Sequence, residues 1–436
     1  MTFNKLPRAE HEAELLEKCA TYLPSGVRNA SYNPDYMMVI KEARGARITD
    51  CSGNEYIDYL LGSGPMFLGH AHPAVLKAVE QQLQSGTSYL MVSEPAIELA
   101  EEIVKAVPCA EQVSFHNSGS EATFYAMRVA RAFRKRDKIL KFEGAYHGMG
   151  DAALMSTQWT DAPLVFPDAH VDSAGIPASA QSETLIAPYN DFETSSAIIE
   201  KHADELACVI VEPMHRTIPP RPGFLQELRK LTTHLEIPLI FDEVVTGFRL
   251  AYGGAQEFYG VTPDLCTLGK VIGGGFPLAA IVGKDEIMAH FDKARAGADG
   301  FTLQIGTLSG NPLASVAGMA TMEILRRPGS YDRIQATGRA IMLALEENFA
   351  RVGIPAQVVG HPANFDVVFI DRPVRTYRDI LASDAARLKR FNAILRQHGV
   401  LKSKGKFYIS LAHDDADVAQ TVKAIRSAAD EMKSDP

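Results

Sequence analysis

Two residues of the chain stand where a buried strand is expected to end and carry side chains suited to carbonyl chemistry. Lys270 follows "DLCTLG" and precedes three glycines, and Asp242 follows "PLIF". A lysine in an apolar pocket can lose its proton and attack a carbonyl carbon to form a Schiff base. A carboxylate at a buried strand end needs a cationic or hydrogen-bonding partner. The pair therefore indicates carbonyl chemistry assisted by an acid.

A second group of small polar residues follows the apolar run "QVSFH". Ser118, Gly119 and Ser120 stand there, directly before a run with helical periodicity. The free N–H groups and the positive dipole end of a helix start suit a phosphate. A plain helix cap without a ligand is an equally good interpretation of the same residues.

Three more polar residues follow strand-like runs. Tyr146 and His147 lie in "EGAYHG" after "KILKF", and Glu212 follows "LACVIV". The tyrosine ring could stack on a planar ligand. Taken singly, a Tyr or His in a loop is more often a packing or surface residue, and Glu212 alone favours a structural ion pair or a helix cap.

One ligand explains the whole set. Pyridoxal 5′-phosphate (PLP) needs a phosphate site, an aromatic surface, an acid and a lysine. Other motifs are incomplete, since Val271 stands where a P-loop needs Ser or Thr, and Phe67 replaces the third glycine of a dinucleotide fingerprint. The sequence has neither HExxH nor paired cysteines at metal-binding spacing, and no metal site is expected.

The elements that must position these residues form an alternating pattern. From about Pro73 short apolar runs alternate with helical periodicity, which predicts a mostly parallel sheet covered by helices. "ARITDCSGNEYIDYL" predicts a hairpin, and strands at "FDVVFI" and "KFYISLA" indicate a smaller α+β unit. The expected domains are an N-terminal segment of the small domain (1–72), a large PLP-binding domain (73–325) and a C-terminal small domain (326–436).

The composition excludes several classes of protein. The 436 residues include 44 basic and 53 acidic side chains, a net charge of −9 without any basic run, so nucleic acid is not an expected partner. No apolar stretch reaches the roughly 20 residues of a membrane helix, and no signal sequence is recognisable. The five cysteines are scattered, and we expect a cytoplasmic enzyme with reduced thiols.

The motifs together resemble a known family. The chain is similar to the class III, fold-type I PLP-dependent aminotransferases, most closely to the glutamate-1-semialdehyde aminomutase branch. The resemblance runs from about Gly64 to Gly318 and implies an α/β fold, with a large domain built on a mostly parallel seven-stranded sheet and a smaller α+β domain. It rests on "GPMFLGHAHPAV", "NSGSEATFYAMRVARAF", "KILKFEGAYHG", "ACVIVEP", "IFDEVVTGFR", "GAQEFYGVTPDLCTLGKVIGGGFPLAA" and "GTLSGNPLASVAG".

The resemblance also implies roles for individual residues. Lys270 would hold the cofactor aldehyde and then transfer protons, while Asp242 would pair with the pyridine nitrogen. Tyr146 and Val244 would pack on opposite faces of the ring, with Gly273–Gly275 leaving room for backbone around it. Thr307 would bind the phosphate from the second subunit of a homodimer. The remaining cofactor contacts implied are Ser118, Gly119, Ser120, His147 and Glu212.

Two activities fit these roles. The first is an aminotransferase that moves an amino group from an amino acid or amine to a keto acid, aldehyde or ketone, through a Lys270 Schiff base and a pyridoxamine phosphate intermediate. The alternative is glutamate-1-semialdehyde 2,1-aminomutase, which forms 5-aminolevulinate. Three departures from the aminomutase pattern favour the first: Ser63 in place of tryptophan, "EPMHRTIPP" and "FPLAAIVGK".

Some assignments stay open at this stage. Arg249 is a candidate for binding a substrate carboxylate, and an ion pair with Glu243 is as good an interpretation. Ser63 is a second candidate on the substrate side. Residues 158–182 could form a mobile loop over the site or a passive connection. A decarboxylase, a racemase or a regulatory protein on the same fold is also possible, although every expected catalytic position is filled.

Overall fold

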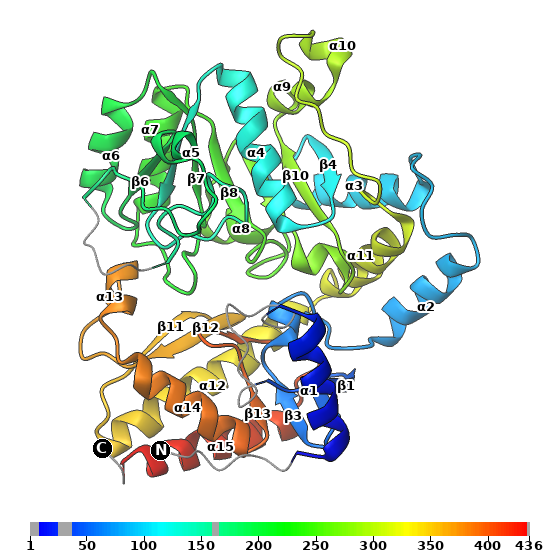
Figure 1. The fold of residues 1–436 in the computed structure, drawn as a ribbon, viewed down its shortest axis with the longest axis vertical. Coiled ribbons are helices and arrows are strands. Elements are labelled where there is room, and N and C mark those ends of the chain that lie inside the picture. Colours follow the sequence, from blue (N-terminus) through cyan, green and yellow to red (C-terminus); the bar gives the residue numbers. More distant parts are fainter. Residues whose placement is uncertain (1–7, 25–36, 159–164, 434–436) are drawn as a thin grey trace.

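The computed structural model describes residues 8–24, 37–158 and 165–433, which form a large and a small lobe (Figure 1). The large lobe is built on a sheet of seven strands in the order β4-β10-β9-β8-β7-β5-β6. All neighbours pair in parallel except β10, which is antiparallel to both β4 and β9. The strands are β4 (Gln112–His116), β5 (Lys138–Phe142), β6 (Thr184–Ala187), β7 (Leu206–Val211), β8 (Leu239–Glu243), β9 (Leu265–Leu268) and β10 (Ala279–Gly283).

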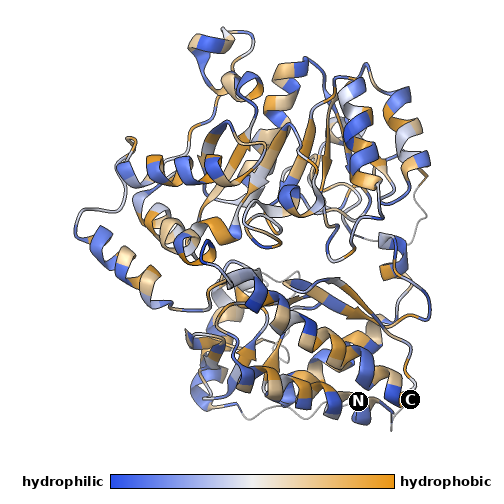
Figure 2. Cartoon of the chain, turned by 180° about the vertical axis from the view of Figure 1, so that it is seen from behind, coloured by the Kyte–Doolittle hydropathy of each residue, from blue (hydrophilic) through white to orange (hydrophobic). Residues whose placement is uncertain are grey.

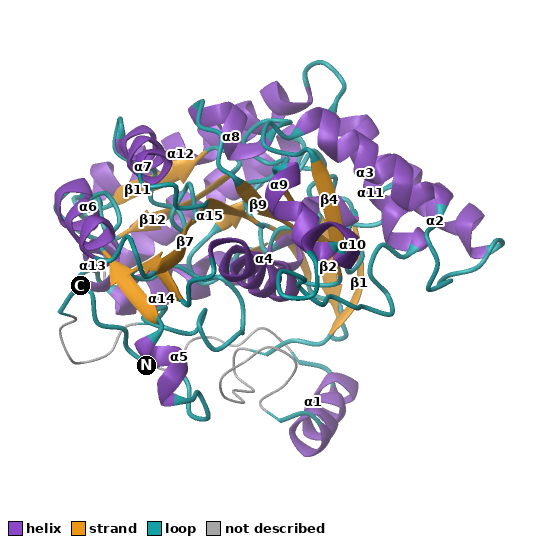
Figure 3. Cartoon of the chain, turned by 90° about the horizontal axis from the view of Figure 1, so that it is seen from above, coloured by secondary structure: helices purple, strands orange, loops and turns teal. Residues whose placement is uncertain are grey.

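This sheet confirms the predicted α/β fold. The apolar runs "QVSFH", "KILKF", "LACVIV", "PLIF" and "DLCTL", interpreted as strands, lie in it together with "LAAIVG", and β6 is the strand that the sequence did not predict. β7 shows why such runs are continuous, because all six of its residues are buried. Cys208 and Ile210 pack on one face with residues of α4 (Gly119–Arg134), and Val209 and Val211 pack on the other with residues of α7 (Phe224–His234). Helices therefore cover both faces (Figure 3).

The small lobe contains two further sheets, with strand orders β1-β2-β3-β13 and β11-β12-β14. The predicted hairpin is formed by β2 and β3, which pair in antiparallel fashion. β13 pairs in parallel with β3, so the C-terminal part of the chain completes a sheet begun near the N-terminus. The strands are β1 (Ile40–Arg44), β2 (Arg47–Asp50), β3 (Glu55–Asp58), β11 (Gln357–His361), β12 (Asn364–Val368), β13 (Val400–Leu401) and β14 (Phe407–Tyr408). The exact domain limits stay a prediction.

Helices surround these sheets and turn their apolar faces inward (Figure 2). The large lobe adds α2 (Pro73–Leu83), α3 (Glu94–Ala106), α5 (Ala178–Ser182), α6 (Phe192–Lys201), α8 (Gly254–Tyr259), α9 (Asp285–Met288), α10 (Lys293–Ala296) and α11 (Pro312–Leu325). The small lobe carries α1 (Glu10–Tyr22), α12 (Ser330–Val352), α13 (Tyr377–Leu381), α14 (Ala385–Gln397) and α15 (Asp415–Lys433). Short 3-10 turns cover Leu61–Ser63, Lys270–Gly273 and Ala289–Phe291. Within the described ranges no helix combines the length and apolar character needed to cross a membrane.

Candidate active site

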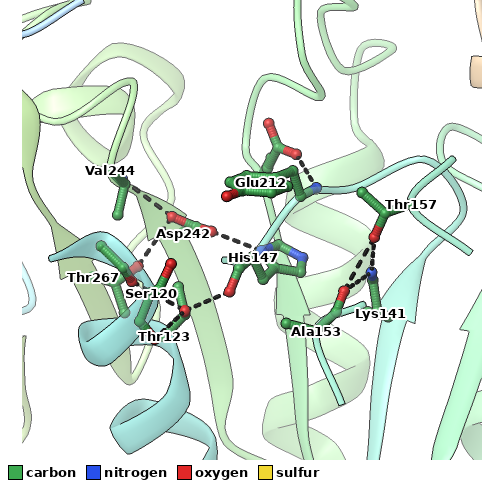
Figure 4. Close-up of polar contacts among 12 residues, drawn as sticks. Ser120, Thr123, Lys141, His147, Ala153, Thr157, Glu212, Asp242, Val244 and Thr267 are labelled. Carbon is green, nitrogen blue, oxygen red and sulfur yellow. Dashed lines mark hydrogen bonds and ion pairs between the residues drawn. The ribbon is translucent and has the colours of Figure 1, made fainter. Parts of the chain in front are cut away.

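Asp242 lies near the carboxyl end of β8 and is almost completely buried, with 6% of its surface exposed. One carboxylate oxygen accepts hydrogen bonds from the Thr267 hydroxyl and the Val244 backbone N–H, each at 3.1 Å. The other lies 2.7 Å from Nδ1 of His147 (Figure 4). Both oxygens are therefore fixed in direction, as expected of an acid that must face one particular atom.

His147 is held from two sides. Its ring contacts Asp242, and its backbone carbonyl accepts a hydrogen bond from the Thr123 hydroxyl of α4 (Figure 4). The Nε2 atom is buried and has no hydrogen-bond partner among the residues that the structure describes. The structure thus places His147 as the partner of Asp242, and its predicted contact with the cofactor stays a prediction.

Lys270 follows β9 and begins a short 3-10 turn with a φ of 49°, a left-handed conformation that is unfavourable for a residue with a Cβ atom. Burial lowers the pKa of its amine, and the charges of Lys406 and Arg249 lower it further, while Tyr408 and Asp242 oppose the shift. In the described part of the chain the amine has no hydrogen-bond partner. A buried, unpaired amine with a lowered pKa is suited to attack a carbonyl.

The start of α4 lies beside this pair. The Ser118 hydroxyl caps the helix by accepting a hydrogen bond from the Glu121 N–H at 3.2 Å, so the predicted helix cap is present. The next two amides, of Gly119 and Ser120, have no acceptor within the described residues and remain available for an anion. A Cβ atom at Gly119 would lie 2.9 Å from the Val244 side chain, which explains why glycine stands there.

Tyr146 and Glu212 form the more open side of the site. The Tyr146 side chain is 42% exposed, and its backbone N–H donates to Oε1 of Glu212 at 2.8 Å. Burial would raise the pKa of Glu212, but the nearby charges, that of Arg216 first, lower it to about 2. Glu212 is therefore a buried anion that orients the loop carrying Tyr146.

These contacts fit the cofactor predicted from the sequence. The unpaired amine of Lys270 suits its aldehyde, the free amides of Gly119 and Ser120 suit its phosphate, and the fixed carboxylate of Asp242 suits its pyridine nitrogen. Among the described residues no group of three or more His, Cys, Asp or Glu could hold a metal ion.

The structure corrects the role predicted for Arg249. This residue is completely buried, and its Nε and Nη2 atoms donate to the carbonyls of Val245 and Gly64. Its guanidinium lies 4.7 Å and 5.1 Å from the ring centres of Phe67 and Tyr408. A bidentate grip on a carboxylate needs two free N–H groups, and only Nη1 is unpaired. Arg249 therefore holds the backbone around it and does not offer the free pair of N–H groups that the predicted substrate role requires.

The alternative predicted for Arg249, an ion pair with Glu243, is also absent. Glu243 accepts hydrogen bonds from the Ala255 and Gln256 amides and from the Thr246 hydroxyl. Burial raises the pKa of Glu243 to about 6. This acid therefore holds the start of α8 and does not pair with Arg249.

Backbone conformation and close packing within the protein explain why glycine stands at two positions of the 273–275 run. Gly274 has a φ of 57°, and a Cβ atom there would lie 2.5 Å from the carbonyl oxygen of Ala317 in α11. Gly275 has a φ of 99° and faces Met66. The run lets the Lys270 turn pack against α11 and the 61–66 turn, and its predicted role in leaving room for backbone around the cofactor stays a prediction.

The remaining predicted positions are placed as follows. Ser63 is half-buried, with a φ of 72°, in the turn whose Gly64 carbonyl binds Arg249. Thr307 is exposed in a segment with the exposed apolar side chains of Leu303, Ile305 and Leu308. Of residues 158–182, positions 159–164 lie outside the described residues. Phe166 and Val171 pack against Met155 and Ile186, which favours a packed connection over a lid.

Sequence reasoning missed four residues near the site. Tyr408 is buried on β14, and although burial would raise its pKa, the charges of Lys406, Lys270 and Arg249 lower it. Lys406 and Tyr408 come from the small lobe, which no strand-end argument about the large sheet could reach. Lys141 lies in the predicted strand "KILKF", and its position within an apolar run was the available signal. Arg216 stood in one of the stretches noted as unusual.

The chain is similar to known proteins along almost its whole length. The family model described as "Aminotransferase class-III" matches residues 29–428. Glutamate-1-semialdehyde 2,1-aminomutase 2 of Brevibacillus brevis is 41% identical over 428 residues, covering 95% of this chain and 97% of that protein.

Solved structures agree in fold over almost the entire chain. An ω-transaminase from Sphaerobacter thermophilus superposes with a TM-score of 0.93 and 35% identity, covering 99% of this chain and 100% of the other. A transaminase solved with PLP bound has a TM-score of 0.89 and 28% identity, with coverage of 98% and 99%.

Proposed function

The chain belongs to the class III aminotransferase family, and from this premise we propose that it catalyses an intramolecular amino transfer, the 2,1-aminomutation of glutamate-1-semialdehyde to 5-aminolevulinate. The observation that carries the proposal is the 41% identity to the Brevibacillus aminomutase along 95% of the chain. The protein is an enzyme of the PLP-dependent class. The aminomutase was the alternative of the sequence analysis, and the curated relatives favour it over the aminotransferase first preferred.

Lys270 and Asp242 are the residues to which we assign the chemistry. When bound, PLP supplies an aldehyde that captures an amino group and a ring that withdraws electrons from the substrate carbon. We assign the aldehyde to the Lys270 amine, which has no competing partner in the described chain. Because its pKa is lowered, this amine is more often neutral and can remove a proton from the amino-bearing carbon. Asp242, oriented by His147, would keep the pyridine nitrogen protonated.

The other residues position these two. We assign the phosphate to Ser118, Gly119 and Ser120 at the start of α4, and the two ring faces to Tyr146 and Val244. His147 and Glu212 contact these cofactor-binding residues and fix their positions. His147 directs the carboxylate of Asp242, and Glu212 holds the backbone of Tyr146.

A second candidate is transamination between two substrates, and a specific observation favours it. The departures from the aminomutase pattern include Ser63 and the stretch after Glu212, and the second of these lies at the open side of the site. There the Arg216 guanidinium is 5.5 Å from the centre of the Tyr146 ring. An enzyme that uses a different amino donor is expected to differ from the aminomutase pattern in the residues on the substrate side and to keep the residues that bind the cofactor. The ω-transaminase with 35% identity is consistent with this candidate.

The homodimer predicted from the sequence is part of the proposal. Thr307 lies in an exposed segment with Leu303, Ile305 and Leu308, and a contiguous exposed apolar surface is typical of a subunit interface. A second copy of the chain would cover these side chains and bring Thr307 to its phosphate. The cytoplasmic location stays a prediction from the sequence.

The experiment that tests the proposed function follows product formation by mass spectrometry. Glutamate-1-semialdehyde is added to the holoenzyme with no other amino donor or acceptor, and the Lys270→Ala variant serves as the inactive control. We expect many molecules of 5-aminolevulinate per enzyme molecule. Failure to form it, together with sustained transfer from alanine, glutamate or 1-phenylethylamine to a keto acid, would reject the mutase in favour of the second candidate.

A further inference from the structure

The turn that follows β7 has a rigid backbone. His215 and Ile218 exchange two backbone hydrogen bonds of 2.9 and 2.8 Å, which close a tight turn. Arg216 within it has a φ of 60°, a left-handed conformation that a residue with a Cβ atom rarely adopts. Its backbone N–H donates to Oε2 of Glu212 at 3.1 Å. A strained backbone held by several bonds indicates that the direction of this side chain matters.

Glu212 fixes Arg216 relative to Tyr146. Its Oε1 accepts the Tyr146 amide and its Oε2 accepts the Arg216 amide, so one buried carboxylate joins the two loops. The Arg216 Nε atom then donates to the carbonyl of Gly144 at 2.9 Å, two residues before Tyr146. Because both loops are tied together, the guanidinium keeps its place above the Tyr146 ring at 5.5 Å.

The outer edge of this guanidinium is free. Only Nε has an acceptor, and neither terminal nitrogen has a hydrogen-bond partner among the residues that the structure describes. The nearest carboxylate contact is 3.9 Å, between Nε and Glu212, whose oxygens already accept two backbone amides. The side chain is 32% exposed. Arg249 differs in each respect, since it is completely buried and two of its nitrogens donate to carbonyls.

A second cation lies on the same side. Lys406 is half-buried, its Nζ atom lies 5.8 Å from the centre of the Tyr408 ring, and its charge acts on both Glu212 and Lys270. The carboxylates of Glu212 and Asp242 are already hydrogen-bonded within the protein. An anion arriving from solvent would meet the free terminal nitrogens of Arg216, with the charge of Lys406 nearby.

We propose that Arg216, supported by Lys406, binds a carboxylate of the substrate on the Tyr146 side of the site, so that the substrates are amino and oxo acids and plain amines are poor ones. A guanidinium with two adjacent free nitrogens offers a planar pair of donors that matches a carboxylate. The proposal rests on the proposed function, since it names the substrate class of the same site. It applies to either candidate reaction, because glutamate-1-semialdehyde and the amino acid donors of a transaminase all carry a carboxylate.

The first test measures binding without turnover. Pentanoate and pentanamide differ only in the charged head group, and each is titrated into the holoenzyme by calorimetry. We expect Arg216→Gln to weaken pentanoate binding about 10- to 100-fold while pentanamide binding is unchanged. Arg216→Lys should retain part of the affinity. The cofactor absorbance of each variant is recorded to establish that the cofactor stays in place.

Arg221→Gln is the matched control, because Arg221 lies five positions further on and is occupied by Glu227 at 2.5 Å. It should bind pentanoate like the unchanged enzyme. Pentanoate binding in Arg216→Gln within twofold of the unchanged enzyme, or an equal loss in both variants, would overturn the proposal. Because pentanoate does not react, either result is independent of whether the enzyme is a mutase or a transaminase.

A second test uses the first half-reaction. Conversion of the cofactor is followed by its absorbance with alanine or with 1-phenylethylamine, which carries no carboxylate. Arg216→Gln should raise the apparent dissociation constant for alanine by a similar factor and leave that for the amine unchanged. Equal effects on both donors would mean that Arg216 only supports the turn, and the proposal would fail.

Discussion

Two lysines in the large sheet share one property and differ in another. Lys141 lies in β5, and Lys270 follows β9 after one residue, Gly269. Burial lowers the pKa of both amines, that of Lys141 to about 7. Asp242 opposes the shift at both positions. Judged by burial and charge alone, each would be a candidate nucleophile.

Hydrogen bonding separates them. Lys141 donates to the carbonyls of Ala153 and Met155 at 2.7 Å and to the Thr157 hydroxyl at 2.9 Å (Figure 4). These three acceptors use all the protons of an ammonium group. Lys270 has no such acceptor among the described residues. A buried amine is therefore reactive only where the protein leaves it unpaired, and a satisfied amine is a structural element.

Lys141 still matters for the site through the loop that it holds. The 153–157 segment is fixed by its three bonds, and the Ser156 carbonyl in that segment accepts the Gly144 N–H at 2.7 Å. Gly144 belongs to the loop of Tyr146 and His147. One lysine thus supports the cofactor loop, while the other is assigned to the cofactor itself.

The largest effect is expected for Lys270→Ala. Removing the unpaired amine should lower turnover by at least about 1,000-fold and abolish covalent trapping of the cofactor by borohydride. Mass spectrometry of the reduced, digested protein measures the trapped peptide. Lys141→Met is the control and should still trap the cofactor at Lys270. An adduct that persists in Lys270→Ala would place the carbonyl chemistry elsewhere and remove the basis of the comparison.

Asp242→Asn tests the carboxylate that acts on both lysines. The amide cannot keep a pyridine nitrogen protonated, so we expect the cofactor to stay bound while turnover falls about 100-fold or more. Absorbance gives the cofactor content, and initial rates give turnover. Thr267→Val, which removes one hydrogen bond to Asp242, is the milder control. Turnover near normal in Asp242→Asn would refute the assigned role.

Lys141→Met should act on stability. At pH 9 the neutral amine has two N–H groups for its three acceptors, and removing them leaves the Met155 carbonyl without a donor, for a loss of about 2–4 kcal/mol in the free energy of unfolding. Urea unfolding followed by circular dichroism measures it. Lys138→Met on the same strand is the control, because Lys138 pairs with Glu205 in a partly exposed ion pair, and it should cost less than about 1 kcal/mol. Equal costs would mean that the buried hydrogen bonds of Lys141 stabilise the protein no more than the partly exposed ion pair of Lys138 does.

The contrast between these lysines also shows how far the sequence could lead. Lys270 was identified because an apolar run ends at it and glycines follow, so its place at a sheet edge followed from strand polarity. Lys141 lies inside the run "KILKF", which also begins with a lysine. Only the packed structure shows that Lys138 pairs at the surface with Glu205 whereas Lys141 points at the 153–157 loop.

The same limit applies to the arginines. Arg249 was predicted to bind substrate from its closeness to Asp242 in sequence, but the turn after β8 points it into the space between Phe67 and Tyr408. Arg216 was not singled out, because its position depends on a turn closed by backbone hydrogen bonds and on a bond to Gly144 from another loop. The sequence specified the strands and the residues at their ends. Side-chain direction in the loops depends on long-range contacts that it does not display.

The pH dependence of stability gives a finer test of Lys141. The unfolded chain keeps this proton up to a pKa of about 10.5, whereas the folded chain releases it above about 7, so the unfolded state binds more protons between these values. The contribution of Lys141 to stability therefore rises with pH across this window and is lost as the pH falls to 7. The cost of Lys141→Met should shrink by up to about 1.4 kcal/mol per pH unit between pH 9 and pH 7. A cost independent of pH would mean that the amine is charged throughout.

The smallest effect at pH 9 is expected for Thr157→Val, and its pH trend is the opposite one. Valine keeps the shape of threonine but removes the hydroxyl that accepts from Lys141 and donates to the Ala153 carbonyl at 3.1 Å. At pH 9 the amine is neutral and one ordinary hydrogen bond is lost, about 1 kcal/mol. At pH 7, close to the pKa of about 7 of Lys141, the lost acceptor serves a donor that is charged in about half of the molecules, so the cost should rise toward about 1.5–3 kcal/mol.

Because Lys141→Met removes the charge and Thr157→Val removes one of its acceptors, their costs should move in opposite directions between pH 9 and pH 7. Urea unfolding at both pH values measures each variant, and Ser182→Ala on α5 is the control. Parallel trends in the two variants would show that the amine is not the titrating group. Opposite trends would assign the pH dependence of stability to Lys141, whose amine is hydrogen-bonded. They would agree with a structural role for Lys141 and a chemical role for the unpaired Lys270.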